Sequence, residues 1–382
     1  MRSRNSNRTV PCRRVTPGLP ILAVLAAVVV ACTSCVPMMR HAGLPSRPAA
    51  LETPRVVTGS SLLAKAAFLA KPPMEVITDL RWGEHLSPPG PKLCAASAEG
   101  AIFTDRQGAV LSTVTFNCRL DRLSILPSTD AAGCQFIDRG SWSSNATLFA
   151  HDGAQLWTYG GSSGVDDMAA GDVDGDGRLE FVVGFNGGGG VHLLDNQGKK
   201  RWQQADGNVW HVEIADLDGT GHQQILHSCA AGEMVLRDKD GNVIRRLHPP
   251  NYFSQFAVCP WPDSAGAQRV ICAGEAGIFV IDATGQAVAT LSAPDAAELN
   301  DLFATPVRLA AGQPASFAVV LSYRHWDRSV LYVYDAKRTL VYEEVIAGPC
   351  GAVTALPTGS ADAEALLVGG TANLWRYDLA AH

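Results

Sequence analysis

A short apolar segment that ends at an aspartate occurs seven times along the chain, usually with glycine soon after it. The intervals between successive aspartates are 47, 43, 43, 44, 53 and 43 residues, so the period is about 45 residues. Aspartate followed by glycine in a short polar turn is typical of a β-hairpin. A repeat of this length constrains the fold more than any other feature of the sequence. The seven aspartates are Asp105, Asp152, Asp195, Asp238, Asp282, Asp335 and Asp378.

Each period contains further apolar runs of strand length. One run lies just upstream of every aspartate segment: LCAA, CQFI, EFVVGF, QILHSC, VICAG, FAVVL and ALLVGG. A third run precedes it, as in VEIADL (212–217), and a fourth usually follows, as in VIRRL (243–247). Four short strands per period are typical of one blade of a β-propeller. The sequence therefore predicts an all-β fold: a seven-bladed β-propeller of four-stranded antiparallel blades over residues 53–382.

The seventh unit is one strand short. It has apolar runs at 352–357, 364–370 and 372–378, and then the sequence given ends. Because a propeller must close its ring to avoid an open sheet edge, we expect an N-terminal strand to complete this blade. Residues 51–58 are the favoured segment, because residues 60–70 read better as a helix.

The first 31 residues have the composition of an export signal. They carry five arginines and no acid, and a short apolar run, Ile21–Ala31, follows the arginines. That run is too short to span a membrane. It ends at Cys32 in a pattern that resembles a bacterial lipobox, so we expect residues 1–31 to be a lipoprotein signal peptide and Cys32 to be lipidated. Cys35 fits less well, and an ordinary cleaved signal or an uncleaved anchor are the alternatives. We expect residues 32–52 to form a flexible tether and the protein to be lipid-anchored to a bacterial membrane, in the periplasm or at the cell surface.

Charge and cysteine content restrict the partners and the compartment. The formal net charge is −6, and losing residues 1–31 makes it more negative by five, which argues against nucleic-acid binding. The chain has ten cysteines, and disulfides are allowed outside the cytosol. Cys259 and Cys272 flank one predicted hairpin and could pair. A small buried hydrophobe is the alternative for Cys94, Cys229 and Cys272.

The densest acidic motif is GDVDGDGRLEFVVGF (171–185). Alternate carboxylates in a glycine-rich loop suit a hard cation such as Ca²⁺, and a carbonyl near Arg178 can add a ligand. The loop is not an EF-hand, because its twelfth position is Val183 and β-branched residues follow it. The predicted metal ligands are Asp172, Asp174, Asp176, Arg178 and Glu180.

This segment resembles the FG-GAP (VCBS-like) repeats of integrin α-type propellers, whose calcium loop lies between the first and second strands of a blade. The next blade has the weaker match ADLDGTGHQQI, where Asp216 and Asp218 agree but Thr220 and Gln224 replace acids. The resemblance is specific over residues 165–245, and the Phe-Gly-Gly-Ala-Pro signature is absent. It implies structural Ca²⁺, since an all-oxygen cage without a free position does not activate water.

A second resemblance concerns the hairpins. GAQLW (153–157) and GKKRW (198–202) are similar to segments of quinoprotein-like propellers, including the outer-membrane assembly lipoprotein. An assembly scaffold is therefore one alternative function.

The predicted binding face lies opposite the calcium loops. Asp167, His211, Gln255 and Asp301 are 44, 44 and 46 residues apart and start four successive innermost strands. They should form part of a polar ring at the mouth of the central channel. Aromatic and charged residues of the same face suit an unknown protein or carbohydrate ligand, although a water-filled channel needs no ligand. The other residues of the predicted face are Trp142, Trp210, Tyr323, His325 and Trp326.

Catalysis has weaker support. His211, between two acids, could be a general base in a polysaccharide-active or other periplasmic enzyme. However, the chain has no nucleophile elbow, zinc motif or paired glutamates. The sequence favours a binding or scaffolding module.

Overall fold

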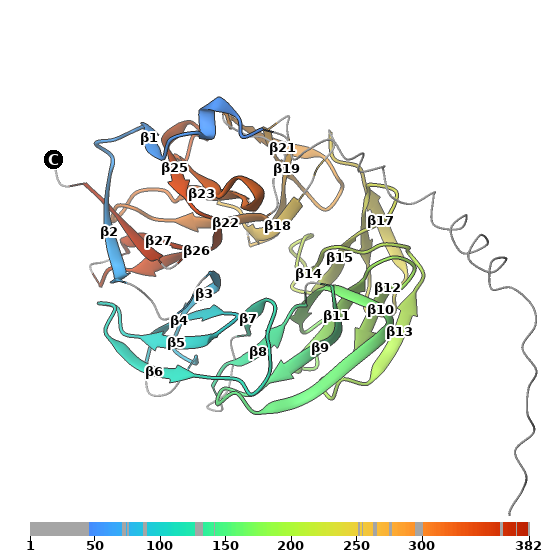
Figure 1. Cartoon of the computed structure of the whole chain (residues 1–382). Helices are drawn as coiled ribbons and strands as arrows, with labels where there is room; N and C mark the ends of the chain where they lie inside the picture. The colour runs from blue at the N-terminus through green and yellow to red at the C-terminus, as the bar shows by residue number, and fades with distance from the viewer. Residues whose placement is uncertain are drawn as a thin grey trace, which may run out of the picture. The chain divides into compact units, whose positions relative to one another are not determined.

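The computed structural model describes residues 46–380, except residues 71–73, 75, 87–89, 127–132, 141, 251–252, 254, 263–265, 275–276, 295–300, 360–361 and 372. The described part is a seven-bladed β-propeller, with the blades arranged around a central axis (Figure 1). Apart from strands it has two single 3₁₀ turns, η1 (Ala49–Leu51) and η2 (Arg324–Trp326). None of its helices is long and apolar enough to cross a membrane. The expected signal peptide, Cys32 and most of the expected tether lie outside the described residues.

The blades follow one another along the chain, and in each blade the first strand lines the channel. From the channel outward, the first blade consists of β3 (Ile77–Gly83), β4 (Lys92–Ser97), β5 (Gly100–Thr104) and β6 (Val110–Val114). The second blade consists of β7 (Leu123–Leu126), β8 (Gln135–Asp138), β9 (Ser143–Phe149) and the first part of β10 (Gln155–Gly171), and the third consists of the second part of β10, β11 (Glu180–Phe185), β12 (Gly190–Leu194) and β13 (Lys200–Gln204). The fourth blade consists of β14 (Val212–Ala215), β15 (Gln224–Ser228), β16 (Met234–Arg237) and β17 (Val243–Leu247).

The fifth blade consists of β18 (Gln255–Pro260), β19 (Gln268–Gly274), β20 (Gly277–Ile281) and β21 (Ala287–Leu291). The sixth blade consists of β22 (Asp301–Val307), β23 (Ser316–Tyr323), β24 (Arg328–Tyr334), β25 (Leu340–Ala347) and the N-terminal β1 (Arg55–Thr58). The seventh blade consists of β26 (Cys350–Pro357), β27 (Glu364–Gly370), β28 (Asn373–Leu379) and the N-terminal β2 (Leu63–Ala70). The strand β10 is continuous, and it joins the second and third blades into one sheet.

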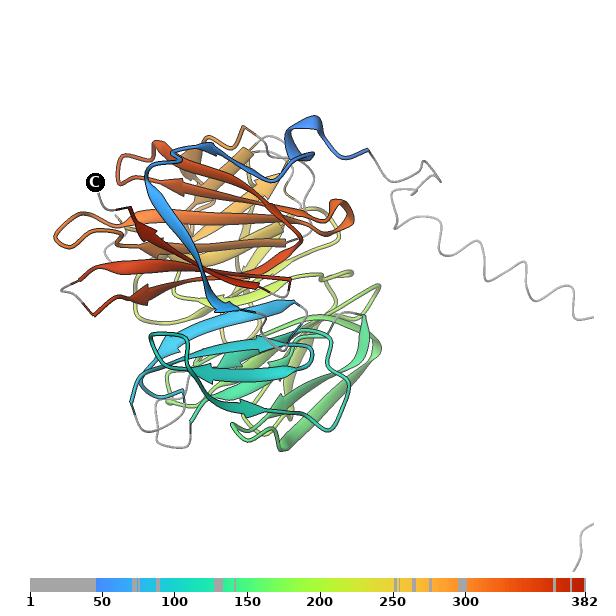
Figure 2. The same cartoon turned by 60° about the vertical axis from the view of Figure 1, so that its left-hand side comes forward.

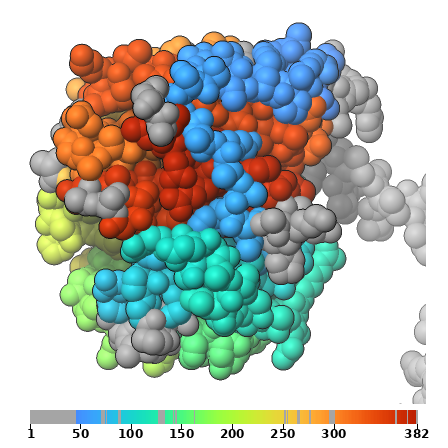
Figure 3. Space-filling view, turned by 90° about the vertical axis from the view of Figure 1, so that its left-hand side faces the viewer, coloured from blue at the N-terminus to red at the C-terminus, as the bar shows by residue number. Residues whose placement is uncertain are grey.

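An N-terminal strand closes the ring, as predicted, but the predicted segment was wrong. The strand β2 pairs with β28 and completes the seventh blade, so residues 60–70 do not form a helix. The favoured segment instead supplies β1, which adds a fifth strand to the sixth blade by pairing with β25. Figures 2 and 3 show this N-terminal segment lying across the C-terminal blades. Pairing of the open β28 edge outweighs the helix propensity of the Ala- and Leu-rich sequence.

The core is divided among the blade boundaries. The described residues form seven apolar clusters, each shared by two neighbouring blades. Side chains alternate along a strand, so the second strand of a blade serves two clusters. In β4, Cys94 and Ala96 face the second blade, whereas Leu93 and Ala95 face the seventh. This double burial explains why the second strands are continuous apolar runs.

The repeating aspartate holds the outer hairpin of most blades. Between β5 and β6, the Asp105 carboxylate accepts hydrogen bonds from the N–H groups of Gln107 and Ala109, both at 2.9 Å. The same two bonds, two and four residues further on, recur at Asp195, Asp238, Asp282 and Asp335.

Two of the seven aspartates were placed wrongly in the repeat. In the second blade Ala150 occupies the equivalent position, and Asp152 lies two residues further into the turn. Asp378 lies inside β28, where it pairs with Arg376. The period nevertheless located the blades, since a shift of two residues is small beside the repeat length.

Cys259 and Cys272, which the sequence allows to pair, do not pair in the structure. Both thiols are free. Cys259 lies opposite Arg269 and Cys272 opposite Phe256, and the two side chains pack in different clusters on the two faces of the fifth blade.

Candidate functional site

The first acidic loop links β10 to β11 and is organised by Asp172. One oxygen of its carboxylate accepts hydrogen bonds from the N–H groups of Gly175 (2.7 Å) and Asp176 (3.1 Å), and the other accepts from Gly177 (2.9 Å). Both glycines have positive φ, 76° and 82°, which a residue without Cβ adopts at little cost. The N–H group of Arg178 donates to Asp176 at 2.8 Å.

Three carboxylates converge in this loop. One oxygen each of Asp172, Asp174 and Asp176 lies within 4.8 Å of the other two. Glu180, fully buried at the start of β11, accepts a hydrogen bond from the Val173 N–H at 3.1 Å. Burial raises the pKa of Glu180, and the nearby Arg201 guanidinium offsets this rise only in part. A hard divalent cation with oxygen ligands fits this donor set.

A cation would compete with Arg201 of β13. Its guanidinium donates to Asp174 at 2.6 Å and lies 3.0 Å from Glu180 Oε1. This contact lowers the pKa of Asp174. Arg201 therefore supplies part of the positive charge that the acidic loop needs.

The second loop, between β14 and β15, has the same backbone hydrogen bonds but two acids fewer than the first. Asp216 accepts hydrogen bonds from the N–H groups of Gly219, Thr220 and Gly221, as Asp172 does in the first loop. Gln224 replaces Glu180: its side-chain oxygen accepts from the Leu217 N–H, and its amide donates to Asp218 at 3.2 Å. Thr220 also donates to Asp218, at 2.7 Å. Neutral side chains thus satisfy Asp218 internally.

On the opposite face, Asp167 joins three blades at the channel mouth. Its side chain is 1% exposed and accepts two hydrogen bonds from Arg139 of the second blade, at 2.7 and 2.9 Å. It also accepts from His211 Nδ1 (2.5 Å) and the Val212 N–H (3.1 Å) of the fourth blade. Burial alone would raise the pKa of Asp167, but the two cationic partners hold it well below its usual range. The predicted neighbourhood of Asp167 and His211 is therefore present.

A second ion pair spans the channel mouth. Arg122, just before β7 of the second blade, lies 3.2 Å from Asp301 of the sixth blade. The second and sixth blades are not neighbours, so this pair crosses the opening. Arg324 lies 2.8 Å from the other Asp301 oxygen. The mouth is thus bridged by charged groups.

The position of His211 suits a structural role better than general-base catalysis. Nδ1 contacts Asp167, and Nε2 lies 3.3 Å from Glu213. Burial disfavours the imidazolium, but the two carboxylates outweigh it and raise the pKa of His211. Because both ring nitrogens face acids, the site favours the imidazolium over the neutral imidazole that a general base requires.

The remaining residues of the predicted face divide by exposure. Trp142 is 80% exposed, whereas Trp210 is half-buried beside Phe253. Tyr323 and Trp326 are 0% and 6% exposed and belong to the core between the fifth and sixth blades. These two rings are therefore not offered to a ligand. Gln255 and His325 are half-buried at this end of their blades.

The sequence analysis missed Arg122 and Glu213, and it did not connect Asp79 with the channel. Arg122 lies 45 residues before Asp167, so extending the alignment by one blade would have found it. Asp79 accepts a hydrogen bond from the N–H of Ile125 in the next blade at 2.8 Å, much as Asp167 does from Val212.

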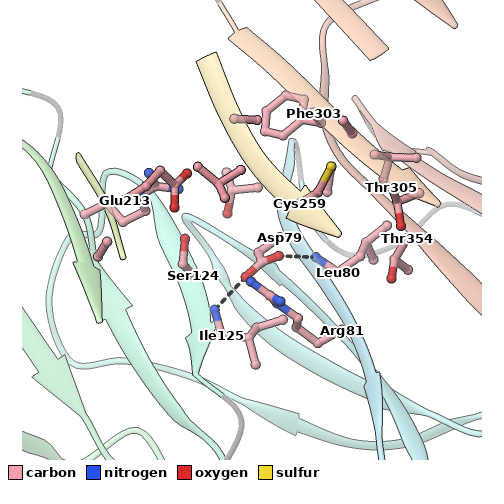
Figure 4. A pocket seen from close by; sticks show the side chains of 18 of the residues that line it. Asp79, Leu80, Arg81, Ser124, Ile125, Glu213, Cys259, Phe303, Thr305 and Thr354 are labelled. Carbon is pink, nitrogen blue, oxygen red and sulfur yellow. Dashed lines mark hydrogen bonds and ion pairs between the residues drawn. The ribbon is translucent and has the colours of Figure 1, made fainter. Parts of the chain in front are cut away.

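Below the mouth, the channel holds a cavity of about 450 Å³. All seven innermost strands contribute to its lining. Figure 4 shows Asp79 and Arg81 on one side of the cavity and Glu213, Cys259 and Phe303 around it. Two acids, three arginines and three threonines share this wall with a larger number of aliphatic side chains, and their polar groups can bind water.

Comparison with known proteins supports the class of fold. Residues 172–227 match the FG-GAP-like repeat family model, which spans both acidic loops. No curated protein sequence matches the chain. Two solved structures of BBS1N in complex with ARL6DN, soaked with mercury and with lead, match with TM-scores of 0.56 and 0.54 and identities of 11% and 12%. Each match covers 84% of this chain and 96% or 97% of the other. The chain is thus a seven-bladed β-propeller that contains an FG-GAP-like repeat.

Proposed function

We propose that this propeller is an exported, lipid-anchored interaction module that holds a protein partner on the face around Trp142. The observation that carries this proposal is the exposure of Trp142, which is 80%, together with its φ of 65°. A bulky residue at positive φ is strained by roughly 1–3 kcal/mol. An exposed indole in that conformation adds little to the stability of the free protein, and such a residue is typical of a binding hot spot.

Hydrogen bonds hold the chain at Trp142 and at Arg139 nearby. The backbone N–H of Trp142 donates to the Val165 carbonyl at 3.0 Å. The guanidinium of Arg139, three residues earlier, is held by two hydrogen bonds to Asp167. Arg324, with a side chain 49% exposed, adds a cation on the same face. Contacts that already exist in the free protein lower the conformational entropy that binding costs.

A protein partner suits this face better than a ligand threaded into the channel. The Arg122–Asp301 pair crosses the mouth, so a ligand that entered the channel would first have to separate two opposite charges. A partner that lies on the face keeps the pair intact and covers Trp142. Two solved structures with a similar fold are of BBS1N in complex with another protein, ARL6DN, which is consistent with such a use of the fold.

Ca²⁺ in the first loop is the second part of the proposal. Asp172, Asp174, Asp176 and Glu180 would hold the ion, with a carbonyl near Arg178, and the ion would pin the corner of the third blade. This role is structural, since the loop lies on the face opposite Trp142.

Site-specific photo-crosslinking in the envelope of the producing cells tests the binding face. We expect a photoreactive aromatic residue at position 142, and another at position 324, to give an adduct of one discrete mass. Position 156 is the matched control, because Leu156 is also exposed, at 49%, but lies on the outer strand of the second blade.

The variant Trp142→Gly removes the indole and accepts the positive φ. It should abolish recovery of the partner that the crosslink identifies, with no loss of melting temperature. Equal adducts at positions 142 and 156, or unchanged recovery by Trp142→Gly, would contradict the proposed face.

A further inference from the structure

Two buried cysteines meet at the boundary of the first and second blades. Cys94 lies in β4, and Cys134 directly precedes β8. Both are 0% exposed and belong to one apolar cluster, with Phe103 and Phe136. Burial and hydrogen bonding with the neighbouring Cys134 side chain raise the pKa of the Cys94 thiol, and both cysteines are free thiols in the structure. Two thiols from different blades therefore lie side by side.

The backbone holds this contact in place. The Cys134 N–H donates to the carbonyl of Leu86, a residue of the first blade, at 2.9 Å. Cys94 is fixed within β4 by pairing with Arg81 on one side and Phe103 on the other. Strand pairing and a hydrogen bond between blades thus bring the thiols together, and packing of the cluster keeps them there.

The other thiols lack such a neighbour in the part of the chain that the structure describes. Cys259 and Cys272 lie on opposite faces of one blade, Cys229 and Cys350 lie in other blades, and Cys118 is exposed.

We infer that Cys94 and Cys134 are oxidised to a disulfide that joins the first and second blades. The two thiols lose two protons and two electrons and form one S–S bond. A disulfide oxidant, such as oxidised glutathione or a thiol–disulfide oxidoreductase, accepts the electrons and is reduced to two thiols. The inference concerns the chemistry of the pair and does not depend on the proposed partner or anchor.

Burial determines when this bond can form. Desolvation raises the pKa of the Cys94 thiol well above its usual value, so the folded protein holds little of the nucleophilic thiolate. Neither thiol is open to an oxidant once the blades have closed. The disulfide must therefore form during folding, before the boundary between the blades closes, and afterwards the same burial protects it from reductants.

Refolding of the full chain tests this inference. The Cys118→Ser variant, which lacks the exposed thiol, is denatured, reduced and refolded with a mixture of reduced and oxidised glutathione. The protein is then unfolded in denaturant that contains an alkylating reagent, so that buried free thiols also react, and the digest is analysed by mass spectrometry without reduction. We expect a linked pair of peptides that contain Cys94 and Cys134. Keeping the protein reduced throughout should lower its melting temperature by about 5 °C.

Two variants in the same background separate the disulfide from general core effects. Cys272→Ala should keep the linked peptides and the dependence of the melting temperature on reductant, whereas Cys134→Ala should lose both. If Cys134→Ala does not fold, the linked peptides and the melting temperatures of the oxidised and reduced parent protein still show whether the disulfide forms. Recovery of folded protein with Cys94 and Cys134 both alkylated, or with either linked to another cysteine, would overturn the inference.

Discussion

At the residue scale, the two acidic loops share the same backbone hydrogen bonds but satisfy their remaining acids with different side chains. Both use an aspartate to collect three backbone N–H groups, at Asp172 and at Asp216. The first loop then gathers further carboxylates, which repel one another unless a cation or Arg201 lies nearby. The second loop uses Thr220 and Gln224, whose donors satisfy its remaining acid. The second loop is thus a natural internal control for the first.

Calcium should stabilise the protein through the first loop. A ligand at about 100 times its Kd stabilises a folded protein by about 2.7 kcal/mol, so we expect the melting temperature to rise by several degrees. Asp174→Asn should remove most of this rise, and Asp218→Asn should leave it nearly intact. Thermal unfolding in chelator and in added Ca²⁺ provides the measurement.

Arg201 offers a check on the same prediction. Because its guanidinium contacts the oxygens that a cation would need, Arg201→Gln should tighten calcium binding and enlarge the shift. A melting temperature that chelator and Ca²⁺ leave unchanged in every variant would eliminate the calcium proposal.

The sequence was most informative at this scale where a motif is local. Consecutive residues make the first loop, so its residue types and spacing were enough to find the convergent acids. The channel mouth assembles residues from the second, third, fourth and sixth blades, and only their repeat positions hinted at contact. Tyr323 and Trp326 show the limit of composition: aromatic residues beside a turn can belong to the core.

At the element scale, the N-terminal strands make unequal contributions. The strand β1 pairs with β25 through few residues, and all four of its side chains are exposed. The strand β2 pairs with β28 along most of its length and buries Leu63 and Phe68. It also places Lys65 2.6 Å from Glu344 of the sixth blade and 4.4 Å from the ring centre of Trp375.

Truncation should separate these contributions. A chain that begins at residue 60 loses β1 and the buried Leu51, so we expect it to fold with a melting temperature a few degrees lower. A chain that begins at residue 72 also loses β2 and leaves β28 as an open edge, which favours aggregation. Circular dichroism and size-exclusion chromatography distinguish the two. Cooperative unfolding of the shorter chain at the full-length temperature would show that β2 does not close the ring.

Element assignment from sequence succeeded where burial imposed a pattern and failed where it did not. The second strands are buried on both faces and stood out as apolar runs. Four consecutive side chains of β2, at 64–67, are exposed, and the segment is rich in good helix formers. Its strand conformation comes from the partner β28, about 300 residues away in sequence, which no local pattern reports.

At the scale of the whole molecule, the proposed lipid anchor can be tested by substituting a single cysteine. Metabolic labelling with a fatty-acid analogue should label the full chain expressed in a bacterium. Cys32→Ser should lose the label and Cys35→Ser should keep it, because the lipobox pattern ends at Cys32. Equal labelling of the two variants would place the lipid elsewhere or exclude it.

Ring closure by β2 also has a consequence for the order of folding. The strand β2 is synthesised among the first residues of the propeller, but its partner β28 is among the last. Contacts such as Lys65–Glu344 join residues 279 positions apart, and contacts of such long range slow folding. Blades in the middle of the chain can form from local hairpins while β2 waits without a partner. The final step of folding therefore joins β2, near the start of the domain, to its last strand, and until then two sheet edges stay open to wrong partners.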